Sequence, residues 1–238
     1  MNFLQLVNDV CARVNETELT SENFATAKGF YSTAKNAVNS SIRMINQNEF
    51  QWPFNYVESE DVLTAGTMRY ETPANAKAID YNTFRVKRDD TFGNRTELLR
   101  ELDYEEFLNR YADDEYNTGN TSIRGVPHRI VRAPGSMFLV YPSPKEDYTL
   151  IYEYYSLPVD LILYSDVPTT PEAFRHIIED GAMHYVNNFR NDNESAQISL
   201  GKFGNGVKSM RSIYINRTEY VRDTRTHGSN IKTNDRVS

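Results

Sequence analysis

The chain has 238 residues, 39% of them apolar and 25% charged, so it can bury a core and does not have the composition of a disordered protein. Its net charge of −7 argues against a protein that coats DNA, because nonspecific affinity for nucleic acid comes from neutralising phosphates. The single cysteine, Cys11, excludes an internal disulfide and a cysteine-based zinc site. No run approaches the roughly 18 apolar residues of a membrane span, and we expect no signal peptide at the N-terminus.

Two helices are predicted at the N-terminus. Apolar residues recur at helical spacing over residues 3–14 and place Cys11 in a core. After a polar break, Thr20 or Ser21 is expected to cap a second helix that continues to about Asn48. This second helix carries two apolar stripes, so we expect it to contact more than one neighbour.

A strand-rich region is predicted after Pro53, which ends the helix. Trp52 is expected to fill the junction between the helices and the strands. The predicted strands cover residues 54–63, 66–70, 78–81, 83–87, 129–132, 137–141 and 148–157. The last of these is almost continuously apolar and aromatic, so both of its faces are expected to be covered. Between the strands, Asp103 and Glu106 resemble a capping box that opens an acidic helix through about Asp114.

Two further helices are predicted before the chain becomes polar. The first begins at residues 169–172, with a threonine cap and a proline in the first turn, and continues to about Phe189. The second covers residues 196–214. Its three glycines either allow a close approach of another helix or break this one. Residues 216–238 are almost devoid of apolar side chains and are predicted to be a tail that becomes ordered only on a partner.

These elements predict an α+β fold. The expected architecture is an antiparallel helical bundle built from the N- and C-terminal helices, an inserted β-rich domain with one short helix, and an extended C-terminal tail. The predicted domain limits are residues 1–52, 53–165, 166–215 and 216–238.

Charge is distributed unevenly along this architecture. Residues 97–118 hold eight acidic and two basic residues, whereas residues 201–238 hold eight basic and three acidic residues. Such an asymmetry suggests two partner-facing surfaces of opposite sign. The alternative interpretation is two ordinary solvated faces.

Three groups of residues have the residue types of a catalytic or ligand site. His176, Asp180 and His184, with Glu179 beside them, follow one helix, and we favour a polar helix face over a metal site. In residues 201–209, Val207 separates the last glycine from Lys208, and a helical pattern precedes them, so a phosphate-binding loop is not expected.

Paired carboxylates form the third group. They occur at Glu105–Glu106 and at Asp113–Asp114, as a glycosidase could use them, but adjacent residues on a helix do not face each other. We therefore predict no enzymatic activity and no cofactor.

Several local patterns occur together in the order found in a known family. They are residues 50–55 (Phe-Gln-Trp-Pro-Phe-Asn), the hairpin of residues 141–154, residues 158–161 and residues 168–185. With the N-terminal helix pair, the chain resembles the tail tubular protein A family, the head-to-tail adaptors of short-tailed bacteriophages. The resemblance covers about residues 3–214 and consists of architecture and scattered positions.

The resemblance implies a structural virion protein that is assembled in the host cytoplasm. Twelve copies would form a ring between the portal protein and the tail nozzle protein, and double-stranded DNA would pass through it without specific binding. An acidic wall suits such a channel, because it does not grip phosphates. The channel-facing candidates are Glu101, Glu105, Glu106, Asp113 and Asp114.

The resemblance also implies that the C-terminal segment threads between portal subunits. Its candidate portal-binding residues are Arg217, Tyr220, Arg222, Arg225, Lys232 and Arg236. Two other classes of protein stay open at this point: a virion-associated peptidoglycan hydrolase, and another minor tail or tail-terminator protein.

Overall fold

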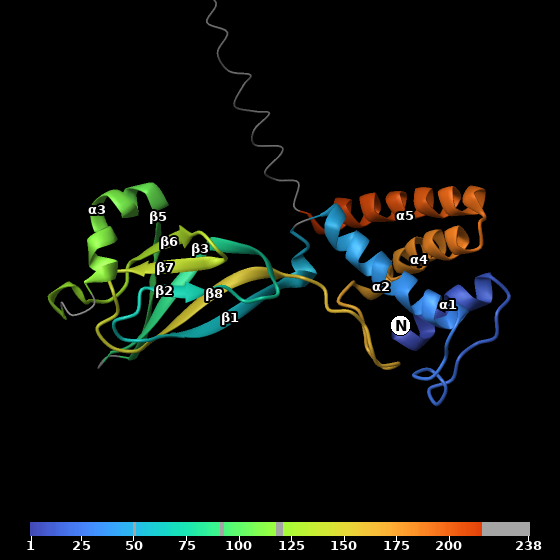
Figure 1. Ribbon diagram of the computed structural model, residues 1–238, viewed down its shortest axis with the longest axis horizontal. Coiled ribbons are helices and arrows are strands. Elements are labelled where there is room, and N and C mark those ends of the chain that lie inside the picture. Colours follow the sequence, from blue (N-terminus) through green and yellow to red (C-terminus); the bar gives the residue numbers. More distant parts are fainter. Residues whose placement is uncertain (50, 91–92, 118–120, 216–238) are drawn as a thin grey trace, which may run out of the picture. The chain divides into compact units, whose positions relative to one another are not determined.

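A computed structural model describes residues 1–49, 51–90, 93–117 and 121–215 (Figure 1). The chain divides into two compact units, which are described separately. The first comprises Met1–Phe54 and the residues from Pro158 onward, and the second comprises Asn55–Leu157. Helices and sheets are both present, which confirms the α+β class. The antiparallel bundle stays a prediction, and the predicted tail lies outside the described residues.

In the described part of the first unit, four α-helices and the short 3-10 helix η3 form the main elements. They are α1 (Phe3–Arg13), α2 (Phe30–Asn48), η3 (Glu172–Phe174), α4 (His176–Phe189) and α5 (Asn193–Tyr214). The four α-helices bury their apolar stripes in one shared core, and α2 and α4 each contact more than one neighbour. Cys11 is fully buried in this core, and burial raises the pKa of its thiol to about 11.

Helix α2 begins later than the sequence pattern predicted. Thr20 and Ser21 do not cap it, because Asn23 accepts a hydrogen bond from the Thr20 backbone N–H (2.8 Å) and stabilises a separate turn. The helix begins only after Gly29, whose φ of +66° is the left-handed conformation that glycine adopts without strain. Phe24 nevertheless packs edge-on against Phe3 in the core, at 5.1 Å between ring centroids.

Trp52 lies in the core of the first unit, immediately before the short helix η1 (Pro53–Asn55). Its indole is completely buried, stacks on Phe54, and donates a hydrogen bond from Nε1 to the carbonyl oxygen of Ile45 at 3.0 Å. The tryptophan thus connects the last turns of α2 with the chain that leaves the unit. Trp52 is buried inside the helical core, and its predicted position at the junction between the helices and the strands stays a prediction.

The glycines of α5 do not break the helix, which is continuous from residue 193 to residue 214. A Cβ added at Gly206 would lie 2.8 Å from a side-chain carbon of Ile177, so this glycine allows α5 to approach α4 closely. Gly204 has no such neighbour within 4 Å. Of the two alternatives left by the sequence, close helix approach is therefore correct at Gly206.

Two four-stranded sheets build the second unit. One sheet has the order β1 (Tyr56–Leu63), β8 (Tyr148–Ser156), β3 (Ala76–Asp90) and β4 (Gly93–Leu98). The other has the order β2 (Arg69–Glu71), β7 (Met137–Tyr141), β6 (Arg129–Ala133) and β5 (Arg100–Leu102). All pairs are antiparallel except β5 with β6. The predicted strands over residues 78–81 and 83–87 are one strand, β3, whose pairing register shifts between Asp80 and Arg85.

The sheets pack face to face over an aromatic core. Phe84 of β3 stacks on Tyr152 of β8 and contacts Phe138 of β7 edge-on. Strand β8 alternates between buried and half-buried residues, so the prediction that both of its faces are covered was wrong. Strand β7 is instead the strand with both faces covered. Phe138 and Val140 face the core between the sheets, whereas Leu139 contributes to a separate cluster on the opposite face.

Candidate interaction surfaces

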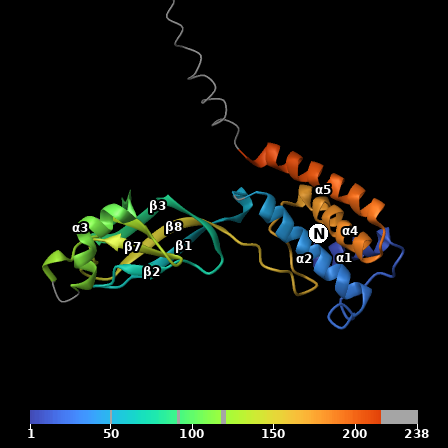
Figure 2. The ribbon, with the colours of Figure 1, turned by 45° about the horizontal axis from the view of Figure 1, so that its top comes forward.

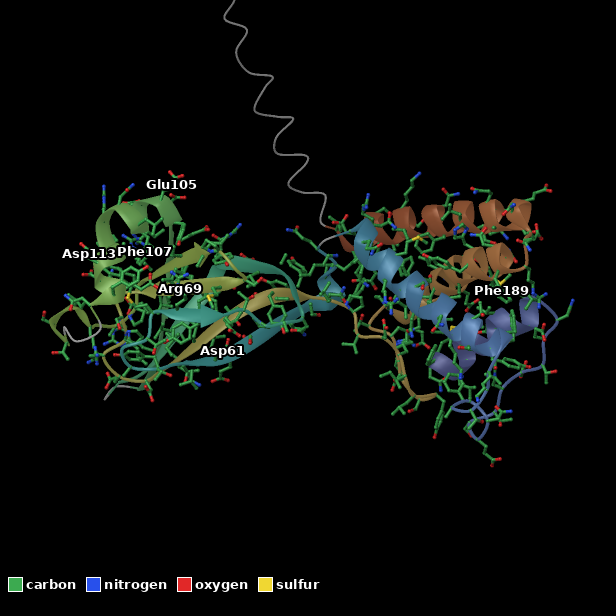
Figure 3. All side chains as sticks on the ribbon, viewed as in Figure 1. Asp61, Arg69, Glu105, Phe107, Asp113 and Phe189 are labelled. Atoms are coloured by element: carbon green, nitrogen blue, oxygen red, sulfur yellow. The ribbon has the colours of Figure 1, made fainter. Side chains whose placement is uncertain are left out.

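Helix α3 (Tyr104–Tyr116) covers the outer face of the sheet that contains β6 and β7. Asp103 caps it as predicted, because its carboxylate accepts hydrogen bonds from the backbone N–H groups of Glu105 and Glu106. Phe107 is completely buried in the cluster under the helix. Figure 3 shows Phe107 directed toward the sheet and Glu105 directed away from it.

Ionic and hydrogen-bonded contacts hold the C-terminal half of α3 on the sheet. Arg69 of β2 binds both carboxylate oxygens of Glu115, at 2.8 and 3.1 Å. Asp114 accepts a hydrogen bond from the Tyr141 hydroxyl at 3.1 Å. Burial, together with this hydrogen bond to the carboxylate, raises the pKa of Tyr141 to about 12, so the phenol remains a donor.

The five predicted channel acids therefore lie in two different environments. Glu101, Glu105 and Asp113 are exposed, and Glu101 lies 3.9 Å from the guanidinium of Arg132, whereas Glu106 and Asp114 are half-buried and engaged with other side chains. Glu106 pairs with Arg110 at 2.8 Å along the helix. The outer face of α3 is thus an acidic surface, but Asp114 belongs to the attachment of the helix rather than to that surface.

The structure does not bring these acids together as a catalytic pair or a metal site. Glu105 is exposed and Glu106 is paired along the helix, which leaves no facing carboxylates. In the described parts of the chain, no group of three or more metal-ligating side chains could hold an ion. Residues 201–209 lie inside α5, so the described structure has no phosphate-binding loop there. Within the same described ranges, no helix is both long and apolar enough to cross a membrane.

The polar face predicted on α4 is partly wrong. Glu179 is buried, only 7% exposed, and its carboxylate contacts the guanidinium of Arg13 at 2.5 Å. Arg13 also binds Asp180 at 2.9 Å and so connects the end of α1 to α4. Burial raises the pKa of Glu179 in spite of the neighbouring guanidinium. No pattern in the sequence identified this pairing, because the partners lie more than 160 residues apart.

An exposed apolar surface, which the sequence patterns did not single out, is formed by the segment that follows β8 along the chain and precedes η3. Residues 158–167 belong to the first unit and expose five large apolar side chains. They are 76% exposed at Val159, 75% at Ile162, 61% at Leu163, 45% at Tyr164 and 57% at Val167. We call this segment the apolar ridge. A signal for it was present in the sequence, since six of its ten residues are apolar and the segment has no helical or strand period.

Hydrogen bonds attach the apolar ridge firmly to α1 and α2. The amide of Asn39 bonds both the N–H and the carbonyl oxygen of Leu161, each at 3.0 Å. Arg43 holds the carboxylate of Asp160 with two nitrogens. Asp166 accepts the N–H groups of residues 162 and 163, and its own carbonyl oxygen accepts the first-turn N–H of Phe3 at 2.7 Å. The ridge is therefore ordered without a partner while its apolar side chains face solvent.

The predicted portal-binding residues all fall outside the described residues. They are Arg217, Tyr220, Arg222, Arg225, Lys232 and Arg236. Their role stays a prediction.

The exposed side chains of the apolar ridge form a patch of the kind that marks an interaction site, so the described surfaces are those of a protein that binds partners. The chain belongs to the SU10 adaptor protein family, whose model matches residues 1–229. This membership is consistent with the predicted head-to-tail adaptor of bacteriophages and supports a structural role in the virion, in contact with portal and tail components. No significant match is found among curated proteins.

Proposed function

We propose that this protein is the subunit of a ring, twelve copies in number, that joins the portal to the tail nozzle and surrounds the DNA channel. One observation carries the proposal: a chain of an adaptor family displays two chemically different surfaces on two separate units. In a ring, one surface of a subunit can contact the neighbouring copy while a chemically different surface faces the channel.

The acidic outer face of α3 is assigned to the channel or to solvent. Glu105 and Asp113 are exposed and directed away from the sheet cluster, and no ion pair to another described residue neutralises them. Such a surface repels phosphates and lets DNA pass without being held. The basic C-terminal segment, residues 216–238, is assigned to the portal contact.

Electron microscopy of the purified protein mixed with portal rings of the same phage tests the proposal. The expected result is a ring of copies on one end of the portal, with the channel open along its axis. Portal rings that stay bare at a saturating protein concentration would contradict it and favour a different component of the tail.

A further inference from the structure

We propose that the apolar ridge of one copy packs against the exposed face of α5 in the neighbouring copy. This inference deepens the proposed ring and rests on it, because it names the two surfaces that join adjacent subunits. The first surface is residues 158–167, which are ordered by their hydrogen bonds to α1 and α2 and expose apolar side chains. A preformed apolar surface of this kind loses little conformational entropy when a partner covers it.

The second surface is the side of α5 that faces away from the core. It consists of residues at spacings of four, three, four and four, which lie on one side of a helix: Ile198, Lys202, Asn205, Ser209 and Ile213. Ile198 is 56% exposed and Ile213 is 68% exposed, and they lie about 22 Å apart along the helix axis. Gly201 and Ser212 flank this stripe, and Lys202 lies between the two isoleucines together with the shorter Asn205 and Ser209.

The two surfaces lie on different sides of the first unit. Figures 1 and 2 both show α5 on one side of α2 and α4, and the segment that follows β8 on the other side. A contact between two different patches on opposite sides of one subunit is heterologous. Such contacts add subunits in one direction and generate rings when the rotation closes, whereas a ridge-to-ridge contact would stop at a dimer.

Charge complementarity favours a second copy as the occupant of the ridge. The ridge contains Asp160 and Asp166 and no basic residue. Arg43 pairs with Asp160, whereas Asp166 has no ion pair with another described residue. The α5 face contributes Lys202, which is exposed and has no ion pair with any residue that the structure describes. The ridge is therefore apolar with residual negative charge, and α5 is apolar at its ends with positive charge between them.

Three variants test the contact in the full-length protein. The ridge variant carries Ile162→Asp and Leu163→Asp, and the α5 variant carries Ile198→Asp and Ile213→Asp. The control carries Val57→Asp and Val62→Asp on β1, which places the same charges on exposed valines of the second unit. All four substituted side chains of the two test variants are exposed, so folding is expected to be retained, as circular dichroism can verify.

Two measurements are made: sedimentation of the free protein over a wide concentration range, and native mass spectrometry of the copies bound to portal rings. Each test variant is expected to self-associate at least about tenfold more weakly than wild type and the control, and to leave portal rings incompletely filled. A mixture of the two test variants should form dimers but no larger species, because one intact ridge then meets one intact α5 face.

The outcomes separate the contact from the ring itself. If wild-type protein forms rings on the portal and both test variants fill portal rings as completely as wild type, the ridge–α5 contact is overturned and the proposed ring stays intact. A mixture of test variants that forms no dimer, while either variant alone still does, would also overturn it. Wild-type protein that stays monomeric at every concentration and leaves portal rings bare would overturn both proposals.

Discussion

Gly181 of α4 faces Ser41 of α2 so closely that a Cβ at position 181 would lie 2.2 Å from the Ser41 hydroxyl oxygen. The same Cβ would lie 2.8 Å from a ring carbon of Phe203 on α5. A single glycine therefore sets the distance between three helices of the core. The sequence places this glycine inside a predicted helix, but it does not show its two neighbours.

Gly181→Ala is expected to destabilise the protein by about 1–3 kcal/mol, because the added methyl group must displace a packed ring and a neighbouring helix. Gly204→Ala is the matched control on α5, since nothing lies within 4 Å of its added Cβ. It is expected to stabilise by roughly 0.5–1 kcal/mol, as alanine favours a helix over glycine. Chemical denaturation of both variants measures the difference, and equal effects of the same sign would contradict the packing described.

Trp52→Ala is expected to cost about 3–5 kcal/mol, because it removes a completely buried indole. Trp52→Phe keeps most of the apolar volume but leaves the carbonyl oxygen of Ile45 without its indole donor, so a smaller loss is expected. Thermal unfolding followed by circular dichroism measures both. A melting temperature unchanged by Trp52→Ala would show that the indole does not connect α2 to the following chain.

The raised pKa of Glu179 makes the first unit sensitive to pH. In the unfolded chain this carboxyl loses its proton at about pH 4, whereas in the folded protein burial makes it retain the proton to higher pH. At pH values between the pKa of Glu179 in the unfolded chain and its higher pKa in the folded protein, the folded state binds more protons than the unfolded state. The contribution of Glu179 to the free energy of unfolding therefore falls as pH rises. Arg13, Asp9, Asp180 and His176 surround it and also influence its titration.

Glu179→Gln removes that titration. The melting temperature of the variant relative to wild type is therefore expected to increase from pH 4 to pH 7. Differential scanning calorimetry at several pH values gives this difference directly. A difference that is constant over the range would mean that Glu179 titrates normally in the folded protein.

Deletion of residues 216–238 is expected to leave the melting temperature of the remaining chain unchanged and to abolish portal binding. The segment holds five basic and three acidic residues and too few apolar side chains for a core of its own. Reversing the charges at Arg217, Arg222 and Arg225 should weaken binding in a salt-dependent way, because exposed ion pairs are screened. A pull-down on portal rings at two salt concentrations tests both changes.

Neutralising the exposed acids of α3 provides the comparison for that experiment. Glu105→Gln with Asp113→Asn is expected to leave portal binding unchanged, since these side chains are assigned to the channel or to solvent. It should also leave folding intact, because neither carboxylate contributes to the attachment of α3 through Arg69 and Tyr141. If the variant that lacks residues 216–238 still binds portal rings fully, the portal contact is made by the helices of the first unit instead.

The sequence by itself determined the elements whose cause is local. Helical spacing placed α1, α4 and α5, the Asp103 cap opened α3, and short runs of apolar and β-branched residues marked β6 and β7, because each pattern acts within a few residues of the chain. Strands β4 and β5 were missed, since their polar residues carry no period that distinguishes a strand from a loop.

Only the tertiary structure decided which side chains meet. Arg13 pairs with Glu179, and Asn39 with Leu161, across separations of more than 100 residues, and no local pattern encodes such a distance. The same holds for exposure: residues 158–167 include six apolar side chains, and hydrogen bonds to α1 and α2 hold their backbone so that Leu161 is buried and the other five are exposed. Burial depends on what the rest of the chain places nearby, and that is a property of the fold rather than of the segment.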